Sequence, residues 1–496
     1  MYKIRQIKYA SSSVSIQVYK IENRKRVIVR HIGTARNEQE QSDLLILAND
    51  YIEKATKQLG LFHQSQSGHI LNLNQTEFIG VYYTFLYELL SKLILRLGFD
   101  KLKNQLLLDL VLLRIIAPTS KLHSIALLEE YFGIKHRRQS YYDVAPLWYK
   151  LKSKAERIAL DFAKRYYGFS FDLLFYDVTT LYFETFEEDE LRKNGFSKDN
   201  KSQQPQILVA LMVTKEGFPI AHEVFSGNTF EGHTIVPVVK RFISKNKIQE
   251  FTVVADAAMI SNENIKNLVE NRISYIVGAR LGNLPADIIS EIDNTLSRQD
   301  GKNIRIKTEN GYLICSYSSA RYRKDKYEMD KQIEKAQFII NNPSKIKKTK
   351  FTKTNAQTMQ LNTALISKTQ KILGIKGYYT NLDERIANND IIIKRYHELY
   401  KIEQAFRISK SDLQTRPIFH YKEEPIKLHL LVCFMALVLS KQIELQAGVS
   451  LKKFIHECKK ITDARLKNRL TGNEITIRAK ITPFVADVLQ KLDLLT

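Results

Sequence analysis

The order of the apolar segments in the middle of this chain restricts its fold more than any other feature. Three apolar runs of strand length come first, at 171–177, 206–213 and 218–225, and Gly217 between the last two suits a hairpin turn. Helical and strand patterns then alternate at 234–246, 251–255, 261–271 and 273–279. Three meandering strands followed by helix, strand, helix and strand are the order of a ribonuclease-H-like α/β domain with a mixed sheet.

After residue 281 this pattern is interrupted. Residues 302–353 contain fourteen Lys or Arg against five Asp or Glu, with tyrosines between them and strand-like fragments. We predict a basic, β-rich insertion over 282–375, and a solvated, partly disordered loop is the alternative. A strand pattern at 376–382 and a helical pattern at about 391–411 then resume the domain. The interrupted α/β domain is therefore predicted to comprise 169–281 and 376–445.

Three further units flank this domain. Residues 1–70 show a β pattern followed by a helix, and residues 71–168 are predicted to be helical. Within the latter, 125–149 fits either a helix-turn-helix that enters DNA or a plain helical bundle. Residues 446–496 are predicted to form a basic helical tail. We expect the first two units to bind DNA and the second also to take part in assembly.

The charge of the chain indicates a polyanionic partner. The sequence has 76 Lys or Arg against 53 Asp or Glu, a formal net charge of +23. This excess is spread along the chain, as expected for a protein that binds nucleic acid. A composition rich in Lys, Ile and Asn can also reflect an AT-rich genome, so charge alone leaves both explanations open.

Cysteine content and hydropathy exclude several other classes. Cys315, Cys433 and Cys458 are far apart and odd in number, which fits neither a disulfide framework nor a paired zinc site. The longest apolar run, 430–439, is shorter than the roughly 20 residues that span a bilayer. The N-terminal residues also lack an apolar signal segment. We therefore expect a cytoplasmic protein.

Two aspartates stand where apolar strand patterns stop. Asp177 follows one apolar run and Asp256 follows another. A carboxylate at that position is expected to project from the carboxyl edge of the sheet into a cleft. In ribonuclease-H order the first and fourth strands are parallel neighbours, so the two carboxylates would lie side by side with cations between them. Taken singly, each aspartate also fits a turn or a helix cap.

A helix after the sheet supplies a third acid. Tyr396, Glu403 and Lys410 recur every seven residues, which places them on one face of a helix. Glu403 would complete an oxygen-rich site for Mg²⁺, beside a phenol and a cation suited to phosphate. The alternative is that Glu403 only pairs with Arg407 one turn away, a surface contact of about 0.3–0.5 kcal/mol.

These acid-bearing segments resemble a known family. FYDVTTLYFE (175–184), VVADAAMIS (253–261) and YHELYKIEQAFRISK (396–410) are similar to the three acid blocks of DDE transposases of bacterial insertion sequences. The last resembles the Tyr-x2-Arg-x3-Glu-x6-Lys signature of the insertion-sequence-four superfamily, in the group with a β-rich insertion. Leu399 stands where that signature has arginine. The resemblance extends from about residue 100 to 440.

The resemblance implies a reaction, a cofactor and partners. Asp177, Asp256 and Glu403 would be catalytic and hold two Mg²⁺ or Mn²⁺ ions for DNA cleavage and strand transfer in cut-and-paste transposition. The DNA contacts that it implies come from the residues around the third acid: Tyr396, Arg407, Lys410 and Arg416. The partners would be terminal inverted repeats and target DNA, bound by a homodimer or higher oligomer at the nucleoid of a bacterium or archaeon.

Two other functions fit parts of the sequence. A non-catalytic or domesticated transposase-derived DNA-binding protein would have the same fold, but the chain retains all three acids. A phosphatase with an aspartyl nucleophile at Asp177 would need a second acid two residues on, where Thr179 stands.

Overall fold

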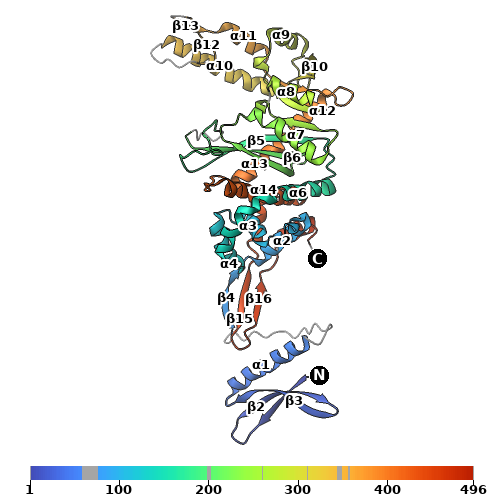
Figure 1. The fold of residues 1–496 in the computed structure, drawn as a ribbon, viewed down its shortest axis with the longest axis vertical. Coiled ribbons are helices and arrows are strands. Elements are labelled where there is room, and N and C mark those ends of the chain that lie inside the picture. Colours follow the sequence, from blue (N-terminus) through green and yellow to red (C-terminus); the bar gives the residue numbers. More distant parts are fainter. Residues whose placement is uncertain are drawn as a thin grey trace.

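The structure, a computed structural model, describes residues 2–57, 76–197, 203–259, 261–309, 311–342, 349–355 and 358–494. The predicted boundary between the first two units, at residues 70 and 71, lies outside the described residues. Figure 1 shows a layered arrangement in which the central sheet has helices above and below it. The predicted mixed α/β class is confirmed.

A mixed sheet of eight strands forms the centre of the molecule, in the order β10-β11-β14-β9-β8-β5-β6-β7. β5 and β8 pair in parallel, as do β8 and β9, and the remaining neighbours are antiparallel. The strands are β5 (Leu174–Tyr182), β6 (Gln206–Thr214), β7 (Pro219–Ser226), β8 (Thr252–Ala255), β9 (Ser274–Ala279), β10 (Asn303–Thr308), β11 (Gly311–Tyr317) and β14 (Ile375–Thr380). With α7 (Ile235–Asn246) and α8 (Asn262–Glu270) between strands, the predicted element order is present.

Residues 282–375 are more helical than predicted. They form α9 (Ala286–Thr295), α10 (Ser319–Asn341) and α11 (Thr363–Lys371), while β12 (Thr352–Asn355) and β13 (Thr358–Leu361) make a separate hairpin. Helix α10 alone has 23 residues, so the β-rich description was wrong. Its apolar face is sparse: Met329, Ala336 and Ile339 are its buried residues among many charges. The segment's own strands β10 and β11 extend the central sheet.

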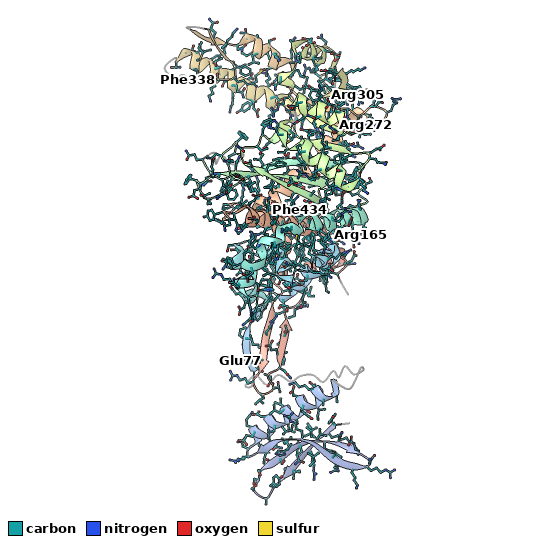
Figure 2. The ribbon with its side chains drawn as sticks, in the orientation of Figure 1. Glu77, Arg165, Arg272, Arg305, Phe338 and Phe434 are labelled. Carbon is teal, nitrogen blue, oxygen red and sulfur yellow. The ribbon has the colours of Figure 1, made fainter. Side chains whose placement is uncertain are left out.

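The helical region packs beneath the sheet and contains α2 (Thr84–Leu97), α3 (Gln105–Ile116), α4 (Lys121–Phe132), α5 (Arg138–Trp148) and α6 (Lys152–Tyr167). The prediction that 71–168 is helical throughout was wrong at β4 (Thr76–Tyr82). Figure 2 labels Glu77 of this strand. β4 pairs with β15 (Asp463–Asn468), which pairs with β16 (Glu474–Arg478). The C-terminal tail is therefore not only helical: these strands lie between α15 (Leu451–Cys458) and α16 (Pro483–Lys491).

Helix α14 (Glu423–Ala447) is the central core helix. The apolar run 430–439 forms the middle of this helix of 25 residues, which is long and apolar enough to cross a membrane. The bent pair α3 and α4, at 85°, passes the same test of length and composition. However, 94% of the apolar window of α14 is buried inside the protein, where it contacts α3, α5 and β7. Its hydropathy is that of a core helix.

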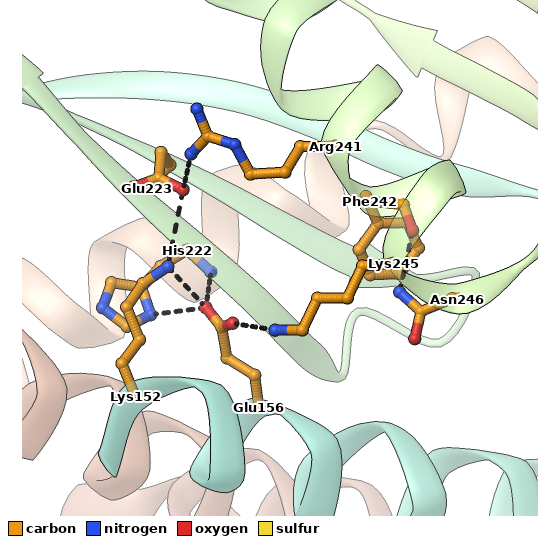
Figure 3. A network of polar contacts seen from close by, with 8 residues as sticks. All are labelled: Lys152, Glu156, His222, Glu223, Arg241, Phe242, Lys245 and Asn246. Carbon is orange, nitrogen blue, oxygen red and sulfur yellow. Dashed lines mark hydrogen bonds and ion pairs between the residues drawn. The ribbon is translucent and has the colours of Figure 1, made fainter. Parts of the chain in front are cut away.

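A network of hydrogen bonds and ion pairs connects α6 to the edge strand β7 (Figure 3). Glu156 of α6 lies 3.1 Å from Lys152 and 3.4 Å from Lys245, and it accepts a hydrogen bond from the backbone N–H of His222 at 3.2 Å. Burial holds the pKa of His222 well below its usual value, so the ring is neutral. That ring stacks on Phe434 of α14 (labelled in Figure 2), with centroids 4.7 Å apart. These contacts hold the helices against the sheet.

Candidate active site

The two strand aspartates lie at adjacent positions of the sheet. β5 and β8 pair in parallel with Tyr176 opposite Ala255, and Asp177 and Asp256 are the next residues along each strand direction. The predicted juxtaposition of these two acids is present. Asp177 is half-buried and Asp256 is exposed. Two carboxylates at neighbouring positions repel each other, and a cation bound between them would remove this repulsion.

The prediction that Asp177 ends its strand was wrong. β5 continues to Tyr182 because β6 pairs with it along its whole length, with Asp177 opposite Leu211. β8 does end at Ala255, and Asp256 begins the chain's departure from the sheet. Each aspartate accepts a hydrogen bond at Oδ1 from the following backbone N–H, that of Val178 or Ala257, at 2.7 Å. These bonds orient both carboxylates.

Tyr396 reaches the acid pair from α12 (Asn389–His397). Its hydroxyl donates a hydrogen bond to Asp256 Oδ1 at 3.0 Å. Burial, with the Asp256 carboxylate second, raises the pKa of this tyrosine, so the hydroxyl keeps its proton. Tyr396 can come this close to Asp256 only because residue 278 is glycine. A Cβ at position 278 would lie 2.5 Å from the Tyr396 hydroxyl oxygen. Tyr396 therefore contacts an acid of the site directly.

The predicted continuous helix over about 391–411 is broken into three parts. α12 ends at His397, α13 runs over Tyr400–Arg407, and a π-helical turn, η7, runs over Ile408–Asp412. At the first break, the N–H groups of Leu399 and Ile402 bond to carbonyls three residues earlier, which is a tighter turn than an α-helix. The seven-residue repeat therefore does not follow one regular helix face.

The remaining predicted residues lie on these segments or shortly after them. Glu403 and Arg407 are exposed on α13, and Lys410 is half-buried in η7. The Arg416 guanidinium lies 5.8 Å from the ring centroid of Tyr182, at the end of β5. Leu399, which replaces the signature arginine, is 6% exposed and packs in the main hydrophobic core. That position is therefore a core residue in this chain.

Sequence reasoning missed a lysine beside the acids. Lys376 of β14 is half-buried, with its Nζ 4.7 Å from the ring centroid of Tyr396. Burial lowers the pKa of Lys376, and the nearby Asp256 and Glu403 carboxylates oppose this change. Both acids are thus close enough to act on one ammonium group. A charged residue within an apolar strand segment (KGYYT) was the signal for it.

A cavity of about 440 Å³ opens next to Asp256 and Tyr396. It lies between the end of the sheet and α10. Its cationic lining residues are Arg280, Arg321, Lys350 and Lys376, and Asp325 and Glu328 of α10 line it as well. Arg280 follows directly after the apolar strand β9, which is the same pattern that singled out Asp256. The arginines and lysines among these residues can donate hydrogen bonds to a phosphate.

The fit to a metal ion is partial. Asp177 and Asp256 offer two adjacent carboxylates, the oxygen ligands that Mg²⁺ prefers. Within the described part of the chain, no three His, Cys, Asp or Glu side chains are grouped closely enough to hold a metal ion. Glu403 influences the same lysine and tyrosine as Asp256, but it is not grouped with the aspartates.

Adjacent carboxylates that can hold divalent metal ions are the type of site used by enzymes that process phosphodiesters. The family model for the transposase DDE domain matches residues 169–439, more than half of the 496 residues. This chain belongs to the DDE transposase family, whose activity is DNA transposition and recombination. DDE transposases use divalent metal ions.

No curated protein matches the chain. Among solved structures, the cryo-EM structure of the piggyBac transposase synaptic complex with hairpin DNA aligns with a TM-score of 0.36 and 11% sequence identity. The alignment covers 76% of this chain and 69% of that chain. A TM-score this low assigns no residue of this chain a role.

Proposed function

We propose that this protein is the transposase of a bacterial insertion sequence of the insertion-sequence-four superfamily. It cleaves DNA at the ends of the element and joins them to target DNA by cut-and-paste transposition. The observation that carries this proposal is the adjacent position of Asp177 and Asp256 on parallel strands. The match to the family and the net charge of +23 support it.

The domain organisation follows from the same proposal. Residues 169–281 and 376–445 form the ribonuclease-H-like catalytic domain, and 282–375 are its insertion. The N-terminal unit and the helical region bind element ends and assemble the complex, and 446–496 follow as the tail. The protein works at the nucleoid as a homodimer or higher oligomer.

The metal site in this proposal comprises Asp177, Asp256 and Glu403, which hold two Mg²⁺ or Mn²⁺ ions. When bound, these ions would activate a water for attack on the phosphodiester and stabilise the departing 3′ oxygen. The contact that supports a role for the α12–η7 segment in this proposal is the Tyr396–Asp256 hydrogen bond at 3.0 Å. In this proposal Glu403 supplies the third ligand from the next helix, α13.

The chain's own residues orient the acids and bind the DNA. Tyr396 holds one oxygen of Asp256, leaving its other oxygen for a cation. Lys376 and Arg280 face the cavity beside Asp256 and provide donors for a phosphate. Lys410, Arg407 and Arg416 are proposed to contact the DNA backbone near the cleaved bond.

A direct assay tests the proposed activity. The purified protein, given Mg²⁺ and DNA that carries the inverted repeats flanking its gene, should produce breaks with 3′-OH ends at the element boundary. Scrambled DNA serves as the control, and a phosphomonoester substrate tests phosphatase chemistry. We expect cleavage of element-end DNA and no release of phosphate from the monoester. Phosphomonoester hydrolysis without DNA cleavage would contradict the proposal.

Lys410→Ala separates phosphate contacts from metal ligands. The substitution removes a cationic donor and no oxygen ligand, so strand transfer from pre-cleaved DNA should decrease while Mn²⁺ affinity stays unchanged. We expect a decrease of about tenfold or more, since hydrogen bonds to charged groups contribute about 1.5–3 kcal/mol. Lys394→Ala, at an exposed position of α12, is the matched control. Loss of Mn²⁺ binding in Lys410→Ala would show that the lysine supports the metal site instead.

A further inference from the structure

The three-stranded sheet at the N-terminus carries an unusual charge distribution. β1 (Tyr2–Lys8), β2 (Val14–Glu22) and β3 (Lys25–Ala35) pair in the order β1-β2-β3. Residues 2–35 contain eight Lys or Arg and one acid, Glu22. The helix that follows, α1 (Glu38–Lys57), contains five acids and two lysines. Positive charge is therefore concentrated on the sheet and negative charge on the helix.

Helix α1 covers one face of this sheet (Figure 1). Val14, Ile16 and Val18 of β2 are buried with Ala48 of α1, which defines the covered face. Side chains alternate along a strand, so the residues between them lie on the opposite side. That side is here called the open face, and it includes Lys3, Arg5, Gln17, Tyr19, Ile21, Arg26, Ile28 and His31. Ser15 lies on the same side but is buried.

The open face combines cations with exposed apolar groups. Lys3, Arg5 and Arg26 are exposed, and the Arg26 guanidinium lies 5.7 Å from the ring centroid of Tyr19. Ile21 and Ile28 are 50% and 52% exposed. No acid belongs to this face in the register of the strands. A surface of this kind suits a partner that is polyanionic yet presents apolar groups between its charges.

The β2–β3 hairpin provides a matching shape. Its turn residues Asn23 and Arg24 have φ values of 49° and 62°, which match the tight type I′ turn that preserves strand twist. Neighbouring strands lie about 4.8 Å apart, and the B-DNA major groove, about 12 Å wide, admits a two-stranded ribbon. The major groove of duplex RNA is too narrow and deep for this. Thymine methyl groups supply the apolar contacts.

We propose that the open face of the N-terminal sheet binds double-stranded DNA in the major groove. Lys3, Arg5 and Arg26 contact phosphates or guanine edges, and Ile28 contacts thymine methyl groups. The sheet, and not helix α1, faces the DNA, because the five acids of α1 would be repelled by phosphate. This inference depends on the proposed function only in taking DNA as the partner.

The test uses the full-length protein and two charge-matched triple variants. Lys3→Gln/Arg5→Gln/Arg26→Gln removes three cations from the open face. The control removes three exposed lysines near the central sheet: Lys240→Gln, Lys247→Gln and Lys266→Gln. Both variants have the same net charge, so a difference between them reports position. Binding to element-end DNA, scrambled DNA and duplex RNA is measured at several salt concentrations, with thermal unfolding to check the fold.

We expect the open-face variant to lose at least tenfold in affinity for element-end DNA and the control to change less than threefold. Each lost phosphate contact should reduce the slope of log K against log salt by about 0.9. Ile28→Ser removes no charge, so it should reduce the preference for element-end over scrambled DNA and leave the salt slope unchanged. Equal losses in both triple variants, or an equal loss for duplex RNA, would overturn the proposal.

The outcomes for this inference and for the proposed function are separable. DNA binding is measured without Mg²⁺, so it does not require cleavage. A wild-type protein that binds through the open face but never cleaves DNA would support the sheet and contradict the transposase. Cleavage that persists together with full affinity in the open-face variant would support the transposase and contradict the sheet.

Discussion

Asp256→Asn should abolish Mg²⁺-dependent cleavage of element-end DNA while DNA binding persists. Asparagine keeps the size of the side chain and an oxygen that accepts from the Tyr396 hydroxyl, but it loses the charge that holds a cation. Mutating a residue that hydrogen-bonds to a metal ligand typically lowers activity by about 10–100-fold. Loss of a ligand itself should therefore lower the cleavage rate by more than about 100-fold. Asp177→Asn should have the same effect.

The measurement compares cleavage rates at saturating DNA with affinities from a binding assay. Asp487→Asn, at an exposed position of α16, is the control for loss of one acidic charge. Because Asp177 is half-buried within β5, its variant also needs a thermal unfolding curve. A rate near that of the wild type in either folded variant would remove that aspartate from the site.

Glu403→Gln should lower the cleavage rate by more than about 100-fold as well, if Glu403 completes the metal site. The residue is 147 positions beyond Asp256 (403 − 256) in sequence, yet both carboxylates act on the pKa values of Lys376 and Tyr396. The same DNA assay measures this variant. Glu398→Gln, in the turn between α12 and α13, is the matched control on the same segment.

Glu231 is the strongest competitor for the role of third acid. It begins the short helix η4 (Glu231–His233), which contacts η5 (Ala257–Met259), the turn that follows Asp256. Glu263 and Glu291 also follow Asp256 in the sequence, and they belong to α8 and α9. Rapid cleavage by Glu403→Gln together with an inactive Glu231→Gln would move the third ligand to η4 and refute the role proposed for α13.

The positions of the two aspartates could be predicted because they depend on strand order and local pattern. Apolar runs mark β5 and β8, and the meander of β5, β6 and β7 leaves the other side of β5 free to pair with β8. The parallel register then places Asp177 beside Asp256. Asp177 was nevertheless predicted at a strand end, because Thr179 and Thr180 interrupt the apolar run after it. The strand continues through them because it pairs with β6.

Contacts between distant segments could not be predicted in the same way. β4 appeared helical because its partner β15 lies almost 390 residues further along the chain, and only that pairing makes it a strand. The 1–168 segment would therefore lose the partner of β4 and the α14 contacts if it were isolated. The sparse apolar face of α10 likewise gave too weak a periodic signal to identify a helix.

By itself, the sequence determined the element order, the class of fold and the two aspartates, because these depend on hydrophobic periodicity within short windows. Tertiary structure alone decided the break after His397, the hydrogen bond from Tyr396 to Asp256, and the place of Lys376 beside them. These features arise where α12, β14 and the end of β8 pack together. Burial and electrostatics at such a junction depend on groups far apart in the chain, so a local pattern such as KGYYT marks the lysine but not its neighbours.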